Sequence, residues 1–160
     1  MSKIEDEGSR IEAIAVLDAV EVSIVGFREM FREVAAGVPL LHGHHDALSR
    51  AVGNVLLNAV EASGERGNLA LRVALLGLDG RREVVVAVRD SGTGIPPERL
   101  AAIWEPYVTH KAGGTGLGLA IVRQTVLAHG GRVEAESAPG SGTEIRLIFP
   151  AGDRQNVEEQ

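Results

Sequence analysis

The sequence predicts an α/β (α+β) domain, a two-layer sandwich in which a mixed, mostly antiparallel sheet is covered on one face by helices. Two segments with helical patterning precede a β-hairpin pattern, and a further helix precedes a second hairpin pattern. The chain has 160 residues, 44% hydrophobic and 24% charged, which suits one domain with one core. Only 3% are aromatic, so leucine, valine, isoleucine and alanine must fill that core.

The composition excludes several classes of protein. There is no cysteine, and hence no disulfide framework and no thiolate metal site. The net charge of −6 argues against a general nucleic-acid binder. No apolar run is long enough to span a bilayer, and the N-terminal MSKIEDEGSR lacks the apolar region of a signal peptide. We expect a soluble, cytoplasmic protein with no direct membrane span.

The first third of the chain gives the weakest pattern. Residues 11–22 are apolar without a clean period and fit either a helix or a strand. Residues 24–35, IVGFREMFREVA, predict an amphipathic helix, and a short strand, VPLLHG, follows at 38–43.

Residues 46–63 give the clearest helical pattern, with Asp46 as the expected N-cap. Asn54 and Asn58 lie four residues apart, away from the apolar face of this helix. That face is expected to consist of Leu48, Val52, Val55, Leu56, Ala59 and Val60.

Two hairpins are expected in the rest of the chain. Residues 69–89 alternate around Asp79-Gly80, a typical hairpin turn, and the loop DSGTGIPP leads into a short helix near Pro97. A helix ending at Gly130-Gly131 follows. The second hairpin reads RVEAESA, PGSG, TEIRLIF.

The stretch KAGGTGLGLAIV, residues 111–122, places four glycines at the start of that helix. Free N–H groups and the helix dipole make such a start a natural phosphate cradle. The order does not fit a P-loop, because Lys111 precedes the glycines, nor a dinucleotide fingerprint, because no strand pattern precedes them. An ordinary surface loop is the alternative.

Three further motifs favour nucleotide binding. They are the Asn54/Asn58 pair, the loop Asp-Ser-Gly-Thr-Gly-Ile-Pro at 90–96, and Gly-Ser-Gly-Thr at 140–143. With the glycine-rich stretch they resemble, in order, the asparagine box and the three glycine boxes of the GHKL ATP-binding superfamily. The resemblance is strongest to the catalytic domain of sensor histidine kinases, nearest to the nitrogen-regulation type, and it implies the Bergerat fold.

The resemblance implies an ATP site. Asp90 would accept a hydrogen bond from the adenine amino group, Gly92, Gly94 and Ile95 would line the base, and Thr143 would support Asp90 and adenine. Asn58 would bind Mg²⁺ as a neutral oxygen ligand, with Asn54 facing the phosphates or a metal-bound water. The remaining cofactor-binding residues implied are Thr109, Lys111, Gly114, Thr115, Gly116, Leu117, Gly118 and Leu119.

Asn54, Asn58 and Lys111 are the implied catalytic residues. Superfamily members of the gyrase type that hydrolyse ATP carry a glutamate base at the position of Asn54. Because an asparagine cannot take a proton at neutral pH, the resemblance favours phosphoryl transfer over hydrolysis. Glu61 is expected to be an exposed helix carboxylate.

The remaining candidates are weaker. His42, His44 and His45 lack an acidic or cysteine partner at ligand spacing, so a metal site there is not favoured. His129 is expected to be structural, at a helix end where a cation is favourable. Trp104 and Tyr107 are expected to pack at the base of the loop that precedes the glycines.

No histidine lies in a pattern like the phosphoacceptor His-Glu-Leu-Arg of a complete sensor kinase. We therefore expect an ATP-dependent histidine kinase domain that acts on a histidine-bearing dimerisation/phosphotransfer domain, and indirectly on a response regulator. Residues 1–22 would be the remnant of a dimerisation helix, 23–150 the catalytic domain and 151–160 a flexible tail. The alternatives are a nucleotide-gated binding module and a serine kinase of the anti-sigma type.

Overall fold

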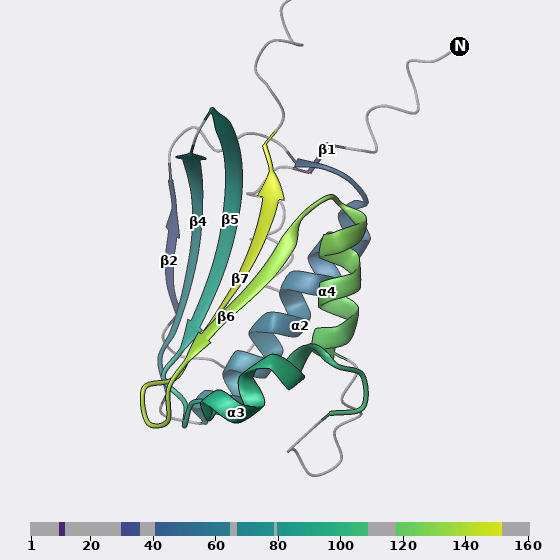
Figure 1. The fold of residues 1–160 in the computed structure, drawn as a ribbon. Helices are drawn as coiled ribbons and strands as arrows, with labels where there is room; N and C mark the ends of the chain where they lie inside the picture. Colours follow the sequence, from purple (N-terminus) through teal and green to yellow (C-terminus); the bar gives the residue numbers. More distant parts are fainter. Residues whose placement is uncertain are drawn as a thin grey trace, which may run out of the picture.

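A five-stranded sheet forms one layer of the structure and helices form the other (Figure 1). The computed structural model describes residues 10–11, 30–35, 41–64, 67–78, 80–108 and 118–151. Only one neighbouring pair of strands is parallel, β2 with β4, and the other three are antiparallel. The predicted fold class is therefore confirmed. The strand order is β2 (Met30–Val34), β4 (Leu69–Leu78), β5 (Arg81–Asp90), β7 (Thr143–Pro150) and β6 (Arg132–Ser137).

The helices cover one face of this sheet. The long helix α2 (His45–Ser63) and the helix α4 (Gly118–Ala128) lie side by side, and α3 (Pro97–Leu100) with the 3₁₀ helix η2 (Ala101–Trp104) lies near the end where β5 finishes (Figure 1). At the opposite end, β1 (Arg10–Ile11) pairs with β3 (Leu41–His42) in a separate antiparallel ladder. No helix in the described ranges is long and apolar enough to span a bilayer.

The core lies between the sheet and the helices. Alternate residues of β5 point toward the helices, because side chains of a strand alternate between the two faces. Val84, Val86 and Val88 are buried there, and Leu71 of β4 packs beside them. Burial of each such side chain contributes about 1.5–3 kcal/mol. On α2 the buried residues are Leu48, Ala51, Val52, Val55, Leu56 and Ala59, close to the predicted apolar face.

Both predicted hairpins are confirmed, and their registers bring three strand ends together. Leu69 at the start of β4 pairs with Asp90 at the end of β5, and Asp90 pairs with Thr143 at the start of β7. Two segments more than fifty residues apart in sequence therefore meet at one end of the sheet. The loops that follow β5 and precede β7 leave from that end.

The predicted helix over 24–35 is wrong where it can be tested. Residues 30–34 form the strand β2, paired in parallel with β4 from Met30–Leu69 to Val34–Val73. The spacing of apolar residues in this short segment also suits a helix, but pairing with a distant strand decides the outcome. The predicted strand at 38–43 is confirmed at Leu41–His42. Residues 12–29 and 36–40 lie outside the described part of the chain.

Of the two predictions about helix ends, the N-cap of α2 is wrong and the C-cap of α4 is confirmed. Asp46 is not the N-cap of α2, because the helix begins at His45 and His44 is the capping residue; Asp46 instead lies in the first turn, where its charge still suits the dipole. At the end of α4, Gly131 N–H donates to Val126 O (2.9 Å) and Gly130 N–H to Leu127 O (3.0 Å). Gly130 has φ +75°, so the predicted glycine C-cap is confirmed as a Schellman motif.

Candidate functional site

Asp90 is the last residue of β5. Its carboxylate is buried, with 7% of the residue's surface exposed. Its Oδ1 accepts hydrogen bonds from Gly92 N–H (2.9 Å) and from Thr143 N–H (3.2 Å). These two donors come from the loop after β5 and from β7. The carboxylate is thus held in one orientation by two segments that are distant in sequence.

Two glycines let the loop after Asp90 follow its course. A Cβ on Gly92 would lie 2.5 Å from the carbonyl oxygen of Ala62, near the end of α2. Gly94 has φ +75°, and a Cβ there would collide with the backbone of Ala138. The loop therefore runs against α2 on one side and against the β6–β7 turn on the other, which only glycine permits.

Ser137, which belongs to none of the predicted motifs, connects this loop to the second hairpin. Its Oγ accepts from Ile95 N–H (2.8 Å), donates to Gly142 O (2.8 Å) and lies 2.8 Å from Thr143 Oγ1. Thr143 is buried, and its amide is one of the two donors to Asp90. No local signal marks a serine at the end of a strand, because all three contacts depend on how the chain folds.

The two asparagines lie one turn apart on α2 and are both half-buried. Asn58 faces the start of α4: its Nδ2 lies 4.0 Å from the position that a Cβ on Gly118 would occupy. Gly118 is the first residue of α4 and the last glycine of the glycine-rich stretch. The structure thus brings Asn58 next to the helix start that the sequence predicts to receive phosphates.

Residues 111–117 of the glycine-rich stretch fall outside the described residues, as do residues 109–110. Among them are six residues predicted to bind the nucleotide: Thr109, Lys111, Gly114, Thr115, Gly116 and Leu117. Of the predicted residues in this region, Gly118 opens α4 and Leu119 is partly buried against the core. The roles assigned to the stretch remain predictions.

The two aromatic residues before this stretch behave differently. Trp104 packs against the hydrophobic core, as expected. Tyr107 is 79% exposed, so the expectation that it packs at the base of the loop is wrong for this structure. It also has φ +65°, a backbone conformation that disfavours residues with a Cβ.

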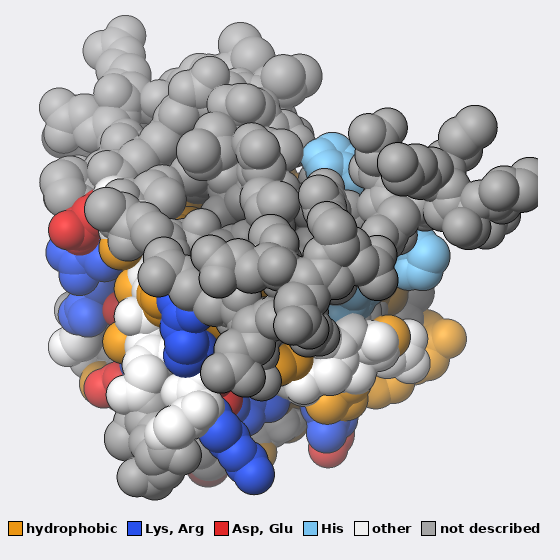
Figure 2. All heavy atoms as spheres, turned by 90° about the horizontal axis from the view of Figure 1, so that it is seen from above, with side chains coloured by type: hydrophobic (Ala, Val, Ile, Leu, Met, Phe, Trp, Pro, Cys, Tyr) orange, Lys and Arg blue, Asp and Glu red, His pale blue; other side chains and the backbone are white. Residues whose placement is uncertain are grey.

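His44 and His129 connect the start of α2 with the end of α4. His129 Nδ1–H donates to Thr125 O (2.6 Å), and its Nε2 accepts from His44 N–H (3.0 Å). An accepting Nε2 carries no proton, so the ring is neutral here rather than the cation that a helix end favours. Histidine side chains are visible at this end of the molecule in Figure 2. No group of three metal-ligating side chains was found among the described residues.

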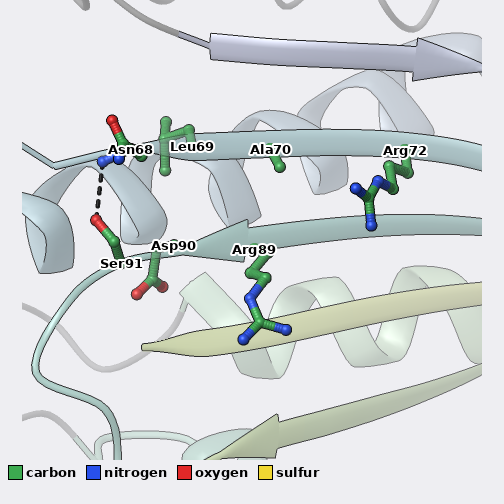
Figure 3. Close-up of a pocket in the computed structure, with 7 residues that line it drawn as sticks. All are labelled: Asn68, Leu69, Ala70, Arg72, Arg89, Asp90 and Ser91. Atoms are coloured by element: carbon green, nitrogen blue, oxygen red, sulfur yellow. Dashed lines mark hydrogen bonds between the residues drawn. The ribbon is translucent and has the colours of Figure 1, made fainter. Parts of the chain in front are cut away.

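A hollow lies on the other face of the sheet, at the same strand ends that carry Asp90. It is lined by Asn68, Leu69, Ala70, Arg72, Arg89, Asp90 and Ser91. Figure 3 shows Arg72 and Arg89 extending over this face from neighbouring strands, with the helices behind the sheet. Asn68 N–H donates to Ser91 Oγ (2.8 Å) across its rim. Arg72 is paired with Glu33 (3.3 Å), and Arg89 lies 4.0 Å from Glu144.

Comparison with known proteins places this geometry in a family. Residues 43–153 match the family model described as histidine kinase-, DNA gyrase B-, and HSP90-like ATPase. The chain is 46% identical over 114 residues to the sensor histidine kinase ZraS of Klebsiella oxytoca, covering 71% of this chain and 24% of that protein. It is 33% identical over 162 residues to the sensory histidine kinase/phosphatase NtrB of Rhizobium meliloti, covering 91% and 42%.

A solved structure agrees with these sequence relatives. The mycobacterial sensor histidine kinase MprB superposes with a TM-score of 0.76 and 31% identity, covering 89% of this chain and 97% of that one. The chain spans about a quarter of the length of ZraS and less than half of NtrB. The resemblance to sensor histidine kinases is confirmed, and the chain belongs to the family of histidine kinase-, DNA gyrase B- and HSP90-like ATPases.

Proposed function

We propose that this chain is the Mg-ATP-binding catalytic domain of a two-component sensor histidine kinase. It transfers the γ-phosphoryl group of ATP to a histidine on a dimerisation/phosphotransfer domain, from which a response regulator receives it. The observation that carries the proposal is the fixed carboxylate of Asp90 at one end of a site, with Asn58 beside the start of α4. We assign residues 23–150 to this domain, with 1–22 and 151–160 as flanking segments.

Asp90 is the group that selects the base. Because Gly92 N–H and Thr143 N–H hold its carboxylate in place, it offers lone pairs to a donor such as the adenine amino group. Gly94 and Ile95 belong to the loop that would lie along the base. Gly118 opens α4, so free amides at this helix start would face the phosphates.

Asn58 fits the role of a magnesium ligand. Its carboxamide, whose Nδ2 lies 4.0 Å from the position of a Cβ on Gly118, is near the start of α4, and its oxygen is a neutral ligand of the kind that Mg²⁺ accepts. One protein oxygen combined with phosphate oxygens and waters is a common environment for Mg²⁺. When bound, the ion would neutralise charge that develops on the transferred phosphoryl group.

Asn54 favours transfer over hydrolysis. Its carboxamide takes no proton at neutral pH, so it cannot act as the base that activates water in the gyrase-type members. The domain would contribute positioning and charge neutralisation, with Asn54, Asn58 and Lys111 around the phosphates, while the attacking imidazole comes from the partner domain.

Incubation with γ-labelled ATP and a histidine-bearing helical hairpin tests the proposal. Acid-labile label on the hairpin is expected, and Asp90→Asn should reduce it. Acid-stable label on a serine would indicate a kinase of the anti-sigma type instead. Tight nucleotide binding with no transfer to either acceptor would indicate a nucleotide-gated binding module.

A further inference from the structure

The hydroxyl of Ser137 has a complete set of hydrogen bonds. A serine hydroxyl has one proton to donate and two lone pairs to accept with. The carbonyl of Gly142 can only accept, so the proton of Ser137 goes to Gly142 O (2.8 Å). Ile95 N–H can only donate, so it takes one lone pair of Ser137 (2.8 Å).

This arrangement fixes the direction of the bond to Thr143. With the proton of Ser137 committed to Gly142, the 2.8 Å contact between Ser137 Oγ and Thr143 Oγ1 requires the proton of Thr143. The hydroxyl proton of Thr143 is then committed to Ser137. Toward any further partner, the Thr143 hydroxyl can therefore only accept a hydrogen bond. Thr143 lies opposite Asp90 in the β5–β7 ladder, and its amide is bonded to that carboxylate.

We propose that Ser137 is a positioning residue that makes the base-binding end of the nucleotide site accept hydrogen bonds only. An ionised carboxylate at Asp90 and a hydroxyl without a free proton at Thr143 both favour an amino group on the base. Both oppose a carbonyl group in the same place, because two facing acceptors repel each other. Ser137 therefore contributes to the choice of a 6-aminopurine over a 6-oxopurine without contacting the base.

The inference rests on the proposed function, since it assumes that the purine lies at Asp90. It goes further by assigning a role to a residue of β6 that lies outside the four nucleotide motifs. The same contacts also hold the loop after β5 through Ile95 and the β6–β7 turn through Gly142. A merely structural role would thus affect every nucleotide equally, whereas the proposed role changes selectivity.

Calorimetric titration of the full chain with Mg-ATP and Mg-ITP tests the proposal. Position 6 of the purine donates in ATP and accepts in ITP, whereas N1 accepts in ATP and donates in ITP. A Thr143 hydroxyl that faces position 6 therefore favours ATP, and an ATP preference that rises in Ser137→Ala would show that the hydroxyl faces N1 and would overturn the proposal.

The unmodified protein should bind ATP at least tenfold more tightly than ITP. In Ser137→Ala the hydroxyl proton of Thr143 becomes free to donate to the 6-oxo group of ITP. The ratio of ATP affinity to ITP affinity should therefore fall at least threefold. Ser137→Thr keeps the hydroxyl and should preserve the ratio within twofold.

Glu136→Gln is the matched control, since Glu136 precedes Ser137 on β6 and bonds to Arg146 on the opposite face of the sheet. The ratio of ATP affinity to ITP affinity in Glu136→Gln should equal that of the unmodified protein. If Ser137→Ala does not remain folded, Ser137→Cys carries the same test, because its sulfur accepts hydrogen bonds only weakly and so leaves the proton of Thr143 available. An unchanged ratio in the folded variant, with or without a parallel loss of both affinities, would overturn the role of Ser137. No preference for ATP in the unmodified protein would instead contradict the proposed function.

Discussion

At the scale of single residues, Asp90 combines a charged acceptor with a fixed orientation. The two backbone donors to its Oδ1 come from Gly92 and Thr143, so the folding of both hairpins is needed to place one carboxylate. A hydrogen bond to a charged group is worth about 1.5–3 kcal/mol. The position is therefore sensitive to changes that alter charge while keeping shape.

Replacing Asp90 by Asn should weaken ATP binding by about ten- to hundredfold, since about 1.4 kcal/mol corresponds to a factor of ten. The amide oxygen can still accept from Gly92 and Thr143, so the fold should persist. Calorimetry with ATP provides the affinity, and thermal unfolding controls for structure. An affinity equal to that of the unmodified protein would mean that Asp90 does not bind the base.

Asn58→Ala tests the metal role. The substitution should abolish the part of ATP affinity that depends on Mg²⁺, while affinity measured with a chelator should hardly change. Leu57→Ala, at the neighbouring exposed position of the same helix, serves as a comparison for general damage to α2. Equal losses with and without Mg²⁺ in Asn58→Ala would show that its contribution is not through the metal.

Tyr107, which precedes the glycine-rich stretch, carries local backbone strain. A positive φ costs a residue with a Cβ about 1–2 kcal/mol, and the ring of Tyr107 recovers little by burial because it is 79% exposed. Tyr107→Gly should therefore raise the free energy of unfolding by about 0.5–1 kcal/mol, after the entropic cost of glycine is deducted. Tyr107→Ala keeps the Cβ and should show no such gain in chemical denaturation. A loss of stability in the glycine variant would contradict this account.

At the scale of the elements, the sheet face opposite the helices is held by charged side chains. Arg132 of β6 reaches across β7 to form two hydrogen bonds with Glu83 of β5 (2.6 and 3.1 Å). Ile148, the partner of Arg132 in the ladder, lies between them and is only 4% exposed. Arg146 lies within ion-pair distance of Glu134, Glu136 and Glu144. These pairs connect β5, β6 and β7 beyond their backbone bonds.

The Arg132–Glu83 pair should make stability depend on pH. The hydrogen bond from Arg132 holds the pKa of Glu83 below its ordinary value of 4.5. A lowered folded-state pKa gives a contribution that is complete above the unfolded pKa and is lost as the pH falls through the folded pKa. The advantage in melting temperature of the unmodified protein over Glu83→Gln should therefore be largest near pH 7 and shrink below about pH 4.5. A difference that stays constant from pH 7 to pH 3 would contradict the pairing.

At the scale of the whole molecule, local patterns predicted most of the fold. The two hairpins, the long helix and the glycine C-cap follow from alternation, periodicity and turn residues that act over a few positions. Strand β2 could not be predicted in this way, because residues 30–34 become extended only through pairing with β4, about forty residues later. The capping position of His44 likewise accompanies a hydrogen bond to His129, 85 residues later in the chain.

In the candidate site too, local motifs identify some residues, and only the folded structure identifies others. Asp90, Asn58 and Thr143 belong to recognisable motifs, and the structure places Asp90 beside Thr143 and Asn58 beside the start of α4. Ser137 belongs to no motif, since its significance lies in contacts with three residues that only the folded chain brings within reach. Sequence identified the groups expected to meet the ligand, and the structure added Ser137, which bonds to Ile95, Gly142 and Thr143.

A crystal structure of the chain with Mg²⁺ and a non-hydrolysable ATP analogue tests the central claim most directly. The account predicts the purine between the loop after β5 and α2, with its 6-amino group within hydrogen-bond distance of the Asp90 carboxylate and its phosphates at the start of α4. A purine bound elsewhere on the molecule, or an oriented nucleotide whose amino group has no contact with Asp90, would contradict it.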